Sequence, residues 1–152
     1  MTVSSNWKRL AGVIAVLAAL VTGYLLYARL VINPGVIEEL RSNPEGAKAA
    51  RAMLLTLPDG RQIPVNYLEE GDKVFAGADG RWWRAFRDGG APVVMEIRGK
   101  ILKGHATVIL DDADYVHDVF ARLRPAAPQW LPDWLNGKLI VVTLDESSGS
   151  SG

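Results

Sequence analysis

Four of the five tryptophans lie where they could wall a pocket for a flat ligand. Trp82 and Trp83 follow the turn signal Asp79-Gly80, and Trp130 and Trp134 lie in a Pro-containing loop before the last predicted strand. Large rings near one end of a barrel can line an apolar site for a planar molecule. The same rings could instead plug the barrel end or rest at a membrane interface. From the residues alone, these two packing roles together are favoured over a ligand pocket.

The titratable residues form no recognisable metal motif. His105 lies in a predicted strand without a second ligand at metal spacing, so we expect a hydrogen-bonded strand histidine, and we expect His117 to be solvated. Asp111, Asp112 and Asp114 lack the spacing of an EF-hand loop, and helix capping explains them better. We therefore expect no metal site.

Composition excludes several further classes of function. The 152 residues hold 17 Lys+Arg against 17 Asp+Glu, so no basic excess favours a nucleic-acid partner. There is no cysteine, which excludes disulfides, thiolate nucleophiles and Cys-ligated clusters. No phosphate-binding glycine motif and no Gly-x-Ser-x-Gly motif occurs, so nucleotide-triphosphate and hydrolase chemistry have no local support.

The N-terminal region predicts a membrane anchor. After a short flank (residues 1–9), an uncharged run begins, LAGVIAVLAALVTGYLLYA from Leu10 to Ala28. A helix of that length spans about 28 Å, close to the hydrocarbon thickness of a bilayer. A signal peptide is the alternative, but the run is long for one and no clear cleavage site ends it. We predict a single transmembrane helix within residues 10–32.

The charges that flank this span give a preferred orientation. Lys8 and Arg9 favour an N-terminus inside the cytoplasm, which would place the following domain outside it. Four cations on the other side, from Arg29 to Arg51, oppose this orientation. The two sets of charges leave a small net preference, from which we expect an extracytoplasmic domain.

Residues 33–51 are predicted to form a linker, with a short helix over Val36–Arg41 and a second helix starting after Asn43. Residues 52–146 show short apolar runs between turn signals, which is typical of a sheet. The last six residues, Ser-Ser-Gly-Ser-Ser-Gly, resemble a flexible linker or tag. The predicted strands are Met53–Leu57, Gln62–Leu68, Lys73–Ala78, Val93–Ile97, Ile101–Leu110 and Leu139–Leu144.

Glu69, Glu70 and Asp72 are expected to form a solvated hairpin tip after the second strand. An amphipathic helix is expected after the Asp cluster and before Pro125, with one apolar stripe at helical spacing. We predict a mainly β (α+β) domain: a closed or nearly closed barrel of about six strands with one packed helix. The apolar stripe of the predicted helix consists of Tyr115, Val116, Val119, Phe120 and Leu123.

Several short motifs carry a resemblance to a known family. They are Leu54–Thr56, Gly60-Arg61, Pro64–Tyr67, Trp82-Trp83 and Pro92–Val94. From residue 53 to residue 144 the chain resembles the deazaflavin-dependent nitroreductases, a branch of the flavin-reductase-like split β-barrels. The resemblance implies a split β-barrel that binds deazaflavin or FMN and passes hydride to quinones or nitro compounds.

The resemblance also implies a set of cofactor-binding residues. Arg61 would hold a cofactor phosphate, and four residues would line the ring and acceptor pocket: Asn66, Tyr67, Trp82 and Trp83.

Two functions from different classes follow. The first is a membrane-anchored oxidoreductase that reduces a lipophilic acceptor such as a quinone. The second is a non-catalytic accessory or interaction subunit of a larger membrane complex, on the same fold. Gly60-Arg61 and the tryptophans favour the first, whereas the single cation of that turn and Ala85, where the family usually has Asn, favour the second. The expected partners are the lipid bilayer, a quinone-like molecule, and either complex subunits or a second copy in a homodimer.

Overall fold

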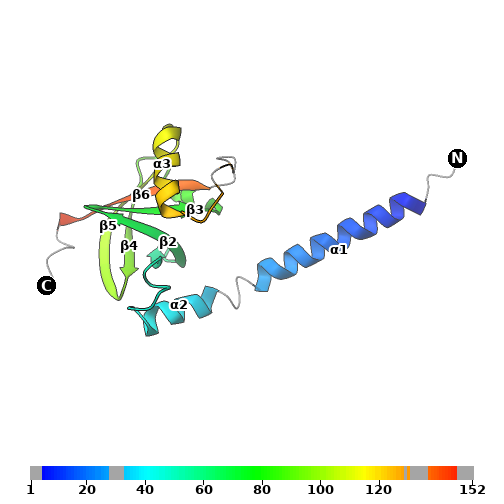
Figure 1. Cartoon of the computed structure of the whole chain (residues 1–152), viewed down its shortest axis with the longest axis horizontal. Coiled ribbons are helices and arrows are strands. Elements are labelled where there is room, and N and C mark those ends of the chain that lie inside the picture. The colour runs from blue at the N-terminus through cyan, green and yellow to red at the C-terminus, as the bar shows by residue number, and fades with distance from the viewer. Residues whose placement is uncertain (1–4, 28–32, 129, 131–136, 147–152) are drawn as a thin grey trace. The chain divides into compact units, whose positions relative to one another are not determined.

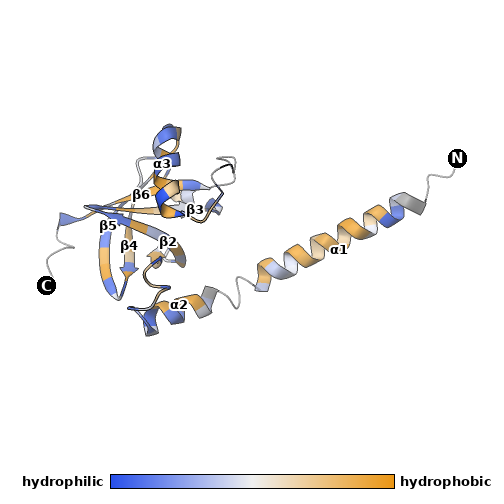
Figure 2. Cartoon of the chain, viewed as in Figure 1, coloured by the Kyte–Doolittle hydropathy of each residue, from blue (hydrophilic) through white to orange (hydrophobic). Residues whose placement is uncertain are grey.

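The computed structural model describes residues 5–27, 33–128, 130 and 137–146. The chain divides into two compact units, Met1–Val36 and Ile37–Gly152, and each is treated separately. The first contains helix α1 (Ser5–Tyr27), which is apolar along most of its length (Figures 1 and 2). Its segment Trp7–Tyr27 contains an 18-residue window with a mean hydropathy of 2.2 and is long and apolar enough to cross a membrane. The rest of the predicted span, residues 28–32, lies outside the described residues.

The linker contains one helix instead of the two predicted. Helix α2 (Asn33–Ser42) confirms the first. The second prediction was wrong, because residues 43–51 form a series of turns, with Gly46 N–H donating to Asn43 O (3.0 Å). Glycine is a poor helix former, and here Gly46 lies so close to the Asn43 side chain that a Cβ would force that side chain to move.

Six antiparallel strands close into a barrel in the order β1-β2-β3-β6-β5-β4, with β4 pairing back to β1. Closure leaves no exposed strand edge. This confirms the predicted barrel of about six strands. The strands are β1 (Ala52–Thr56), β2 (Gln62–Glu70), β3 (Lys73–Ala78), β4 (Ala91–Ile97), β5 (Lys100–Ile109) and β6 (Lys138–Leu144).

Alternation along the strands separates an inner from an outer set of side chains. On β3, Val74 and Ala76 face the barrel interior, whereas Phe75 faces outward. No polar or charged side chain is fully buried within the part of the chain that the structure describes. The interior is therefore held by apolar packing alone. Its fully buried members include Met53, Leu55, Phe86, Met95, Ile140 and Val142.

The predicted amphipathic helix is α3 (Ala113–Leu123), which packs on the outer face of the barrel against β3 (Figure 1). Asp112 caps it by accepting a hydrogen bond from the Tyr115 backbone N–H (3.0 Å). Its apolar stripe buries Val119, Phe120 and Leu123 against Phe75, Leu139 and Val141. Both the helix and its cap are confirmed.

The antiparallel order gives the barrel two distinct ends. Strands β2, β4 and β6 finish at one end, which we call the mouth, beside the β2–β3 and β4–β5 turns. At the other end, β3 leads through the 3₁₀ helix η2 (Arg81–Phe86) into β4, and we call this the plugged end. The β1–β2 turn lies at the plugged end as well, because β2 begins there.

Candidate functional site

The plugged end is filled by aromatic side chains. Phe86 is 1% exposed and belongs to the interior core, and Trp82 and Trp83 pack against that core. The Trp82 and Phe86 rings are 6.2 Å apart and nearly perpendicular, at 88°. The Arg87 guanidinium lies 5.0 Å from the centre of the Trp83 ring. The described geometry therefore uses both tryptophans for packing; Trp134 lies outside the described residues.

Arg61 lies in the β1–β2 turn, where it is engaged by its near neighbour Asp59. Its Nε is 2.7 Å from Asp59 Oδ2, and its backbone N–H donates to Asp59 Oδ1 at 3.0 Å. The backbone hydrogen bond, and then the side-chain bond, hold the pKa of Asp59 below its usual value. The Arg61 side chain is 61% exposed, so this is a solvated turn with its charge already matched.

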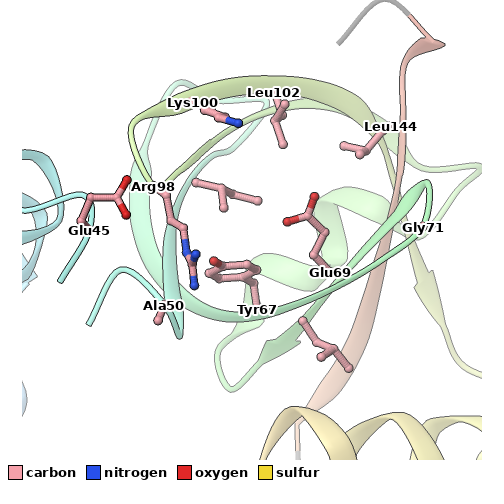
Figure 3. Close-up of a pocket in the computed structure, with 11 residues that line it drawn as sticks. Glu45, Ala50, Tyr67, Glu69, Gly71, Arg98, Lys100, Leu102 and Leu144 are labelled. Atoms are coloured by element: carbon pink, nitrogen blue, oxygen red, sulfur yellow. The ribbon is translucent and has the colours of Figure 1, made fainter. Parts of the chain in front are cut away.

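A cavity of about 740 Å³ opens at the mouth (Figure 3). This volume lies within the range of pockets that bind small molecules. Its walls come from the ends of β2, β4 and β6, the start of β5 and the linker before β1. The lining residues are Glu45, Ala50, Tyr67, Leu68, Glu69, Gly71, Ile97, Arg98, Lys100, Leu102 and Leu144.

Strand register turns several of these side chains toward the interior. Glu69 pairs with Val74, which is fully buried inside the barrel, and Lys100 pairs with the buried Ile97. Directly paired residues of neighbouring strands share a face of the sheet. Glu69 and Lys100 therefore stand on the inner face, just above the apolar core.

Charge is gathered at the mouth without being neutralised there. Two acids and two bases line the cavity: Glu45, Glu69, Arg98 and Lys100. None of the ion pairs among the described residues involves any of the four. By contrast, Arg61, Arg122 and Arg124 each bond to a carboxylate elsewhere on the barrel. The mouth thus presents both signs of charge to whatever enters it.

The β4–β5 turn holds Arg98 in a backbone conformation that non-glycine residues rarely adopt. Arg98 has φ 48° and Gly99 has φ 76°, as a tight two-residue hairpin turn requires. A side chain in the left-handed region costs roughly 1–2 kcal/mol, and Arg is not among the residues favoured there. Strain of this kind is a reason to look for a function of the residue, and the Arg98 side chain lines the cavity.

The linker before β1 completes the mouth. The Tyr67 hydroxyl donates to the Ala49 carbonyl (3.2 Å), and the Tyr67 backbone N–H donates to the Arg51 carbonyl (3.1 Å). Pro44 lies against Gly99, close enough that a Cβ there would approach it to 3.3 Å. These contacts fix the Tyr67 ring and the β4–β5 turn beside the linker, so the cavity walls are preorganised.

The structure separates the residues that the resemblance groups together. Tyr67 lines the mouth, whereas Asn66, its neighbour on β2, is exposed and faces the outer side of the wall. Arg61 precedes β2 and Glu69 is near its end, so up to about 26 Å of strand lies between them. Trp82 and Trp83 are at the plugged end. Of the five predicted residues, Tyr67 alone reaches the mouth.

Sequence reasoning missed Glu69, Arg98 and Lys100 as site residues. Strand β2 continues through Glu70, which pairs with Lys73, so Glu69 is not part of the hairpin tip as predicted. Glu69 could have been found from its spacing, because a residue two positions after Tyr67 on a strand points to the same face of the sheet. Arg98 and Lys100 could have been found because they lie on either side of Gly99 in a tight turn.

His105 fulfils the expectation of a satisfied strand histidine. Its Nε2 lies 2.8 Å from the Gly89 carbonyl oxygen, across from β5 to the segment that follows η2. His117 is exposed on α3. Within the described residues, no group of three or more metal-ligating side chains could hold a metal ion.

In comparisons with known proteins, no protein-family model matches this chain, and no curated protein matches it.

Proposed function

We propose that this protein is a membrane-anchored oxidoreductase whose barrel mouth binds deazaflavin or FMN and reduces a lipophilic acceptor such as a quinone or nitro compound. One observation carries the proposal: the mouth cavity combines an aromatic ring, apolar walls and two bases that form no ion pair among the described residues. This combination suits a ligand with a planar ring and an anionic tail.

The residues at the mouth fit each part of such a cofactor. Tyr67, Leu102 and Leu144 offer apolar and aromatic surface for the ring, while Arg98 and Lys100 offer charge for a phosphate. When bound, the cofactor would supply hydride transfer, and the protein would bind it, orient it and keep water from one side. Because the described interior holds no buried polar side chain, the polar groups for this task come from the mouth.

The site proposed here differs from the one that the resemblance implies. Arg61, the expected phosphate ligand, is already paired with Asp59 at the plugged end. The mouth offers Arg98 and Lys100, which share the cavity with Tyr67. We therefore assign phosphate recognition to the β4–β5 turn in place of the β1–β2 turn.

The anchor fits a lipophilic acceptor. Helix α1 is long and apolar enough to cross a membrane, and a tethered enzyme encounters membrane-dissolved quinones more often than a free one does. We propose an N-terminus inside the cytoplasm and a barrel outside it, from Lys8 and Arg9 before the span.

The alternative function is a non-catalytic accessory subunit or homodimeric interaction module on the same fold. The observation in its favour is the Asp59–Arg61 pair, which neutralises the single cation of the turn where the resemblance expects a phosphate ligand. A barrel that keeps its fold but binds no cofactor would match this description.

The test is a spectrum of the detergent-purified full chain, followed by titration with FMN and with deazaflavin. We expect saturable binding that R98Q/K100Q weakens about 100-fold or more, since two charge-assisted hydrogen bonds are lost and each contributes about 1.5–3 kcal/mol. The matched control is R61Q, which removes an exposed cation at the other end and should change the Kd less than twofold. A large loss in R61Q alone would move the site to the plugged end. A wild-type protein that binds neither cofactor would support the accessory function.

A further inference from the structure

We infer that the mouth selects a ligand with two features: an anionic group that binds Arg98 and Lys100, and a hydrogen-bond donor that binds Glu69. The inference rests on the proposed function, because it takes the mouth to be the ligand site. It adds the requirement for a hydrogen-bond donor on the ligand, which binding of an anionic group by the two bases alone would not impose.

The first observation is the position of Glu69. It is on the inner face of β2, opposite Val74, and its carboxylate is directed into the cavity in Figure 3. Its neighbour Glu70 faces the other side of the wall and is bonded to Arg122 of α3. Two adjacent carboxylates therefore have different surroundings: one is held by a base, and the other enters the cavity.

The second observation is that Glu69 shares the cavity with two bases without pairing with either. Arg98 and Lys100 line the same space, yet neither appears in an ion pair among the described residues. The three groups reach the cavity from different elements, β2 for the acid and the β4–β5 turn and first residue of β5 for the bases. A ligand can thus lie between them.

An ionised carboxylate accepts hydrogen bonds and donates none. A ligand that carries only negative charge would gain from the two bases but would be repelled by Glu69. A ligand with an anionic tail and an N–H on its ring satisfies both sides. The ligand class is therefore a planar heterocycle with an imide-type N–H and a phosphate or carboxylate tail, which includes flavins and deazaflavins.

The experiment compares three probes on the full chain in detergent: FMN, N3-methyl FMN, which lacks the imide donor, and inorganic pyrophosphate as a competitor. E69Q should weaken FMN about tenfold, because a charge-assisted hydrogen bond becomes a neutral one. It should not weaken N3-methyl FMN, which has no imide donor to lose and whose phosphate is freed from the same repulsion. It should strengthen pyrophosphate about threefold, because a repulsive charge is removed. The matched control is E70Q, which changes the adjacent, outward carboxylate and should alter no Kd at the mouth.

Each outcome decides the inference. Opposite changes for FMN and pyrophosphate would support it, since damage to the fold would weaken every probe. Equal weakening of all three probes by E69Q, or no change for FMN, would overturn it. In the second case the proposed function stands if the wild type binds FMN and R98Q/K100Q weakens that binding. A wild type that binds neither FMN nor deazaflavin would overturn both.

Discussion

The same six strands build two unlike barrel ends. At the plugged end Phe86 is 1% exposed, and two tryptophans close over the core beside it. At the mouth the lining residues are mostly half-buried or exposed, and four charged side chains surround a cavity of about 740 Å³. One end excludes water by packing, whereas the other admits it together with charge.

The difference shows how a small barrel can hold a site without losing its core. Filling one end with aromatic rings places much of the apolar burial away from the cavity. The mouth can then keep a feature that costs stability, the left-handed backbone of Arg98. We expect substitutions at the plugged end to act on folding, and substitutions at the mouth to act on binding.

The largest expected effect is that of F86A at the plugged end. Removing a fully buried phenyl ring leaves a cavity, so the free energy of unfolding should fall by about 3–5 kcal/mol. Urea denaturation of the detergent-purified full chain, followed by tryptophan fluorescence, measures this change. Because F86A removes the ring contact with Trp82, the fluorescence emission of the folded variant should also shift.

Its counterpart at the mouth is L144A, which truncates a partly buried residue of the cavity wall. We expect a loss of less than about 2 kcal/mol, since the side chain is already partly hydrated. If L144A costs as much as F86A, the two ends do not differ in the way described here, and the mouth is part of the stabilising core.

R98G should have a smaller effect on stability, and it should change two properties in opposite senses: the fold becomes more stable and FMN binding becomes weaker. Glycine adopts the positive φ of this position without a steric penalty, so the free energy of unfolding should rise by about 0.5–1 kcal/mol. The same substitution removes a cation from the cavity, and the Kd for FMN should rise about tenfold. Denaturation and titration of one protein sample measure both effects.

R98N is the control that separates backbone from charge in this turn. Asn tolerates the left-handed region better than Arg does and also lacks the charge. It should stabilise the fold less than R98G does and weaken FMN equally. A variant that becomes both more stable and a better binder would refute the view that strain at Arg98 is kept for the ligand.

Most of the fold followed from alternation and turn signals in the sequence. The predicted strand Lys73–Ala78 has the observed bounds of β3, and the stripe from Tyr115 to Leu123 matches the buried face of α3. These elements are strongly patterned because one face of each is buried. Pro44 suits a first helical turn and so predicts a helix after Asn43, but residues 43–51 form turns, because Gly46 disfavours a helix and lies against the Asn43 side chain.

Less of the candidate site could be predicted, and the reason is geometric. The cavity is made by residues far apart in sequence, such as Glu45, Tyr67 and Leu144, which barrel closure brings together. The family-like motifs group Arg61 with Tyr67 because they are close in sequence, although the length of β2 separates them in space. Glu69 was placed in a turn because two acids before Gly71 look like a hairpin tip, and strand pairing extends two residues further.

The smallest expected effect concerns the Asp59–Arg61 turn, which is at the plugged end but outside its core. The Asp59 pKa is lowered from 3.8, first by the Arg61 backbone N–H and then by its side chain. A carboxyl whose pKa is lower in the folded state stabilises the fold above its unfolded-state pKa, and this contribution is lost as pH falls through the folded-state pKa. D59N should therefore be slightly less stable than wild type near pH 7, and the difference should begin to shrink only below about pH 4 and disappear below the folded-state pKa. Because the group is fully exposed, a difference that persists at low pH, or any change in FMN affinity, would show that this turn does more than stabilise itself.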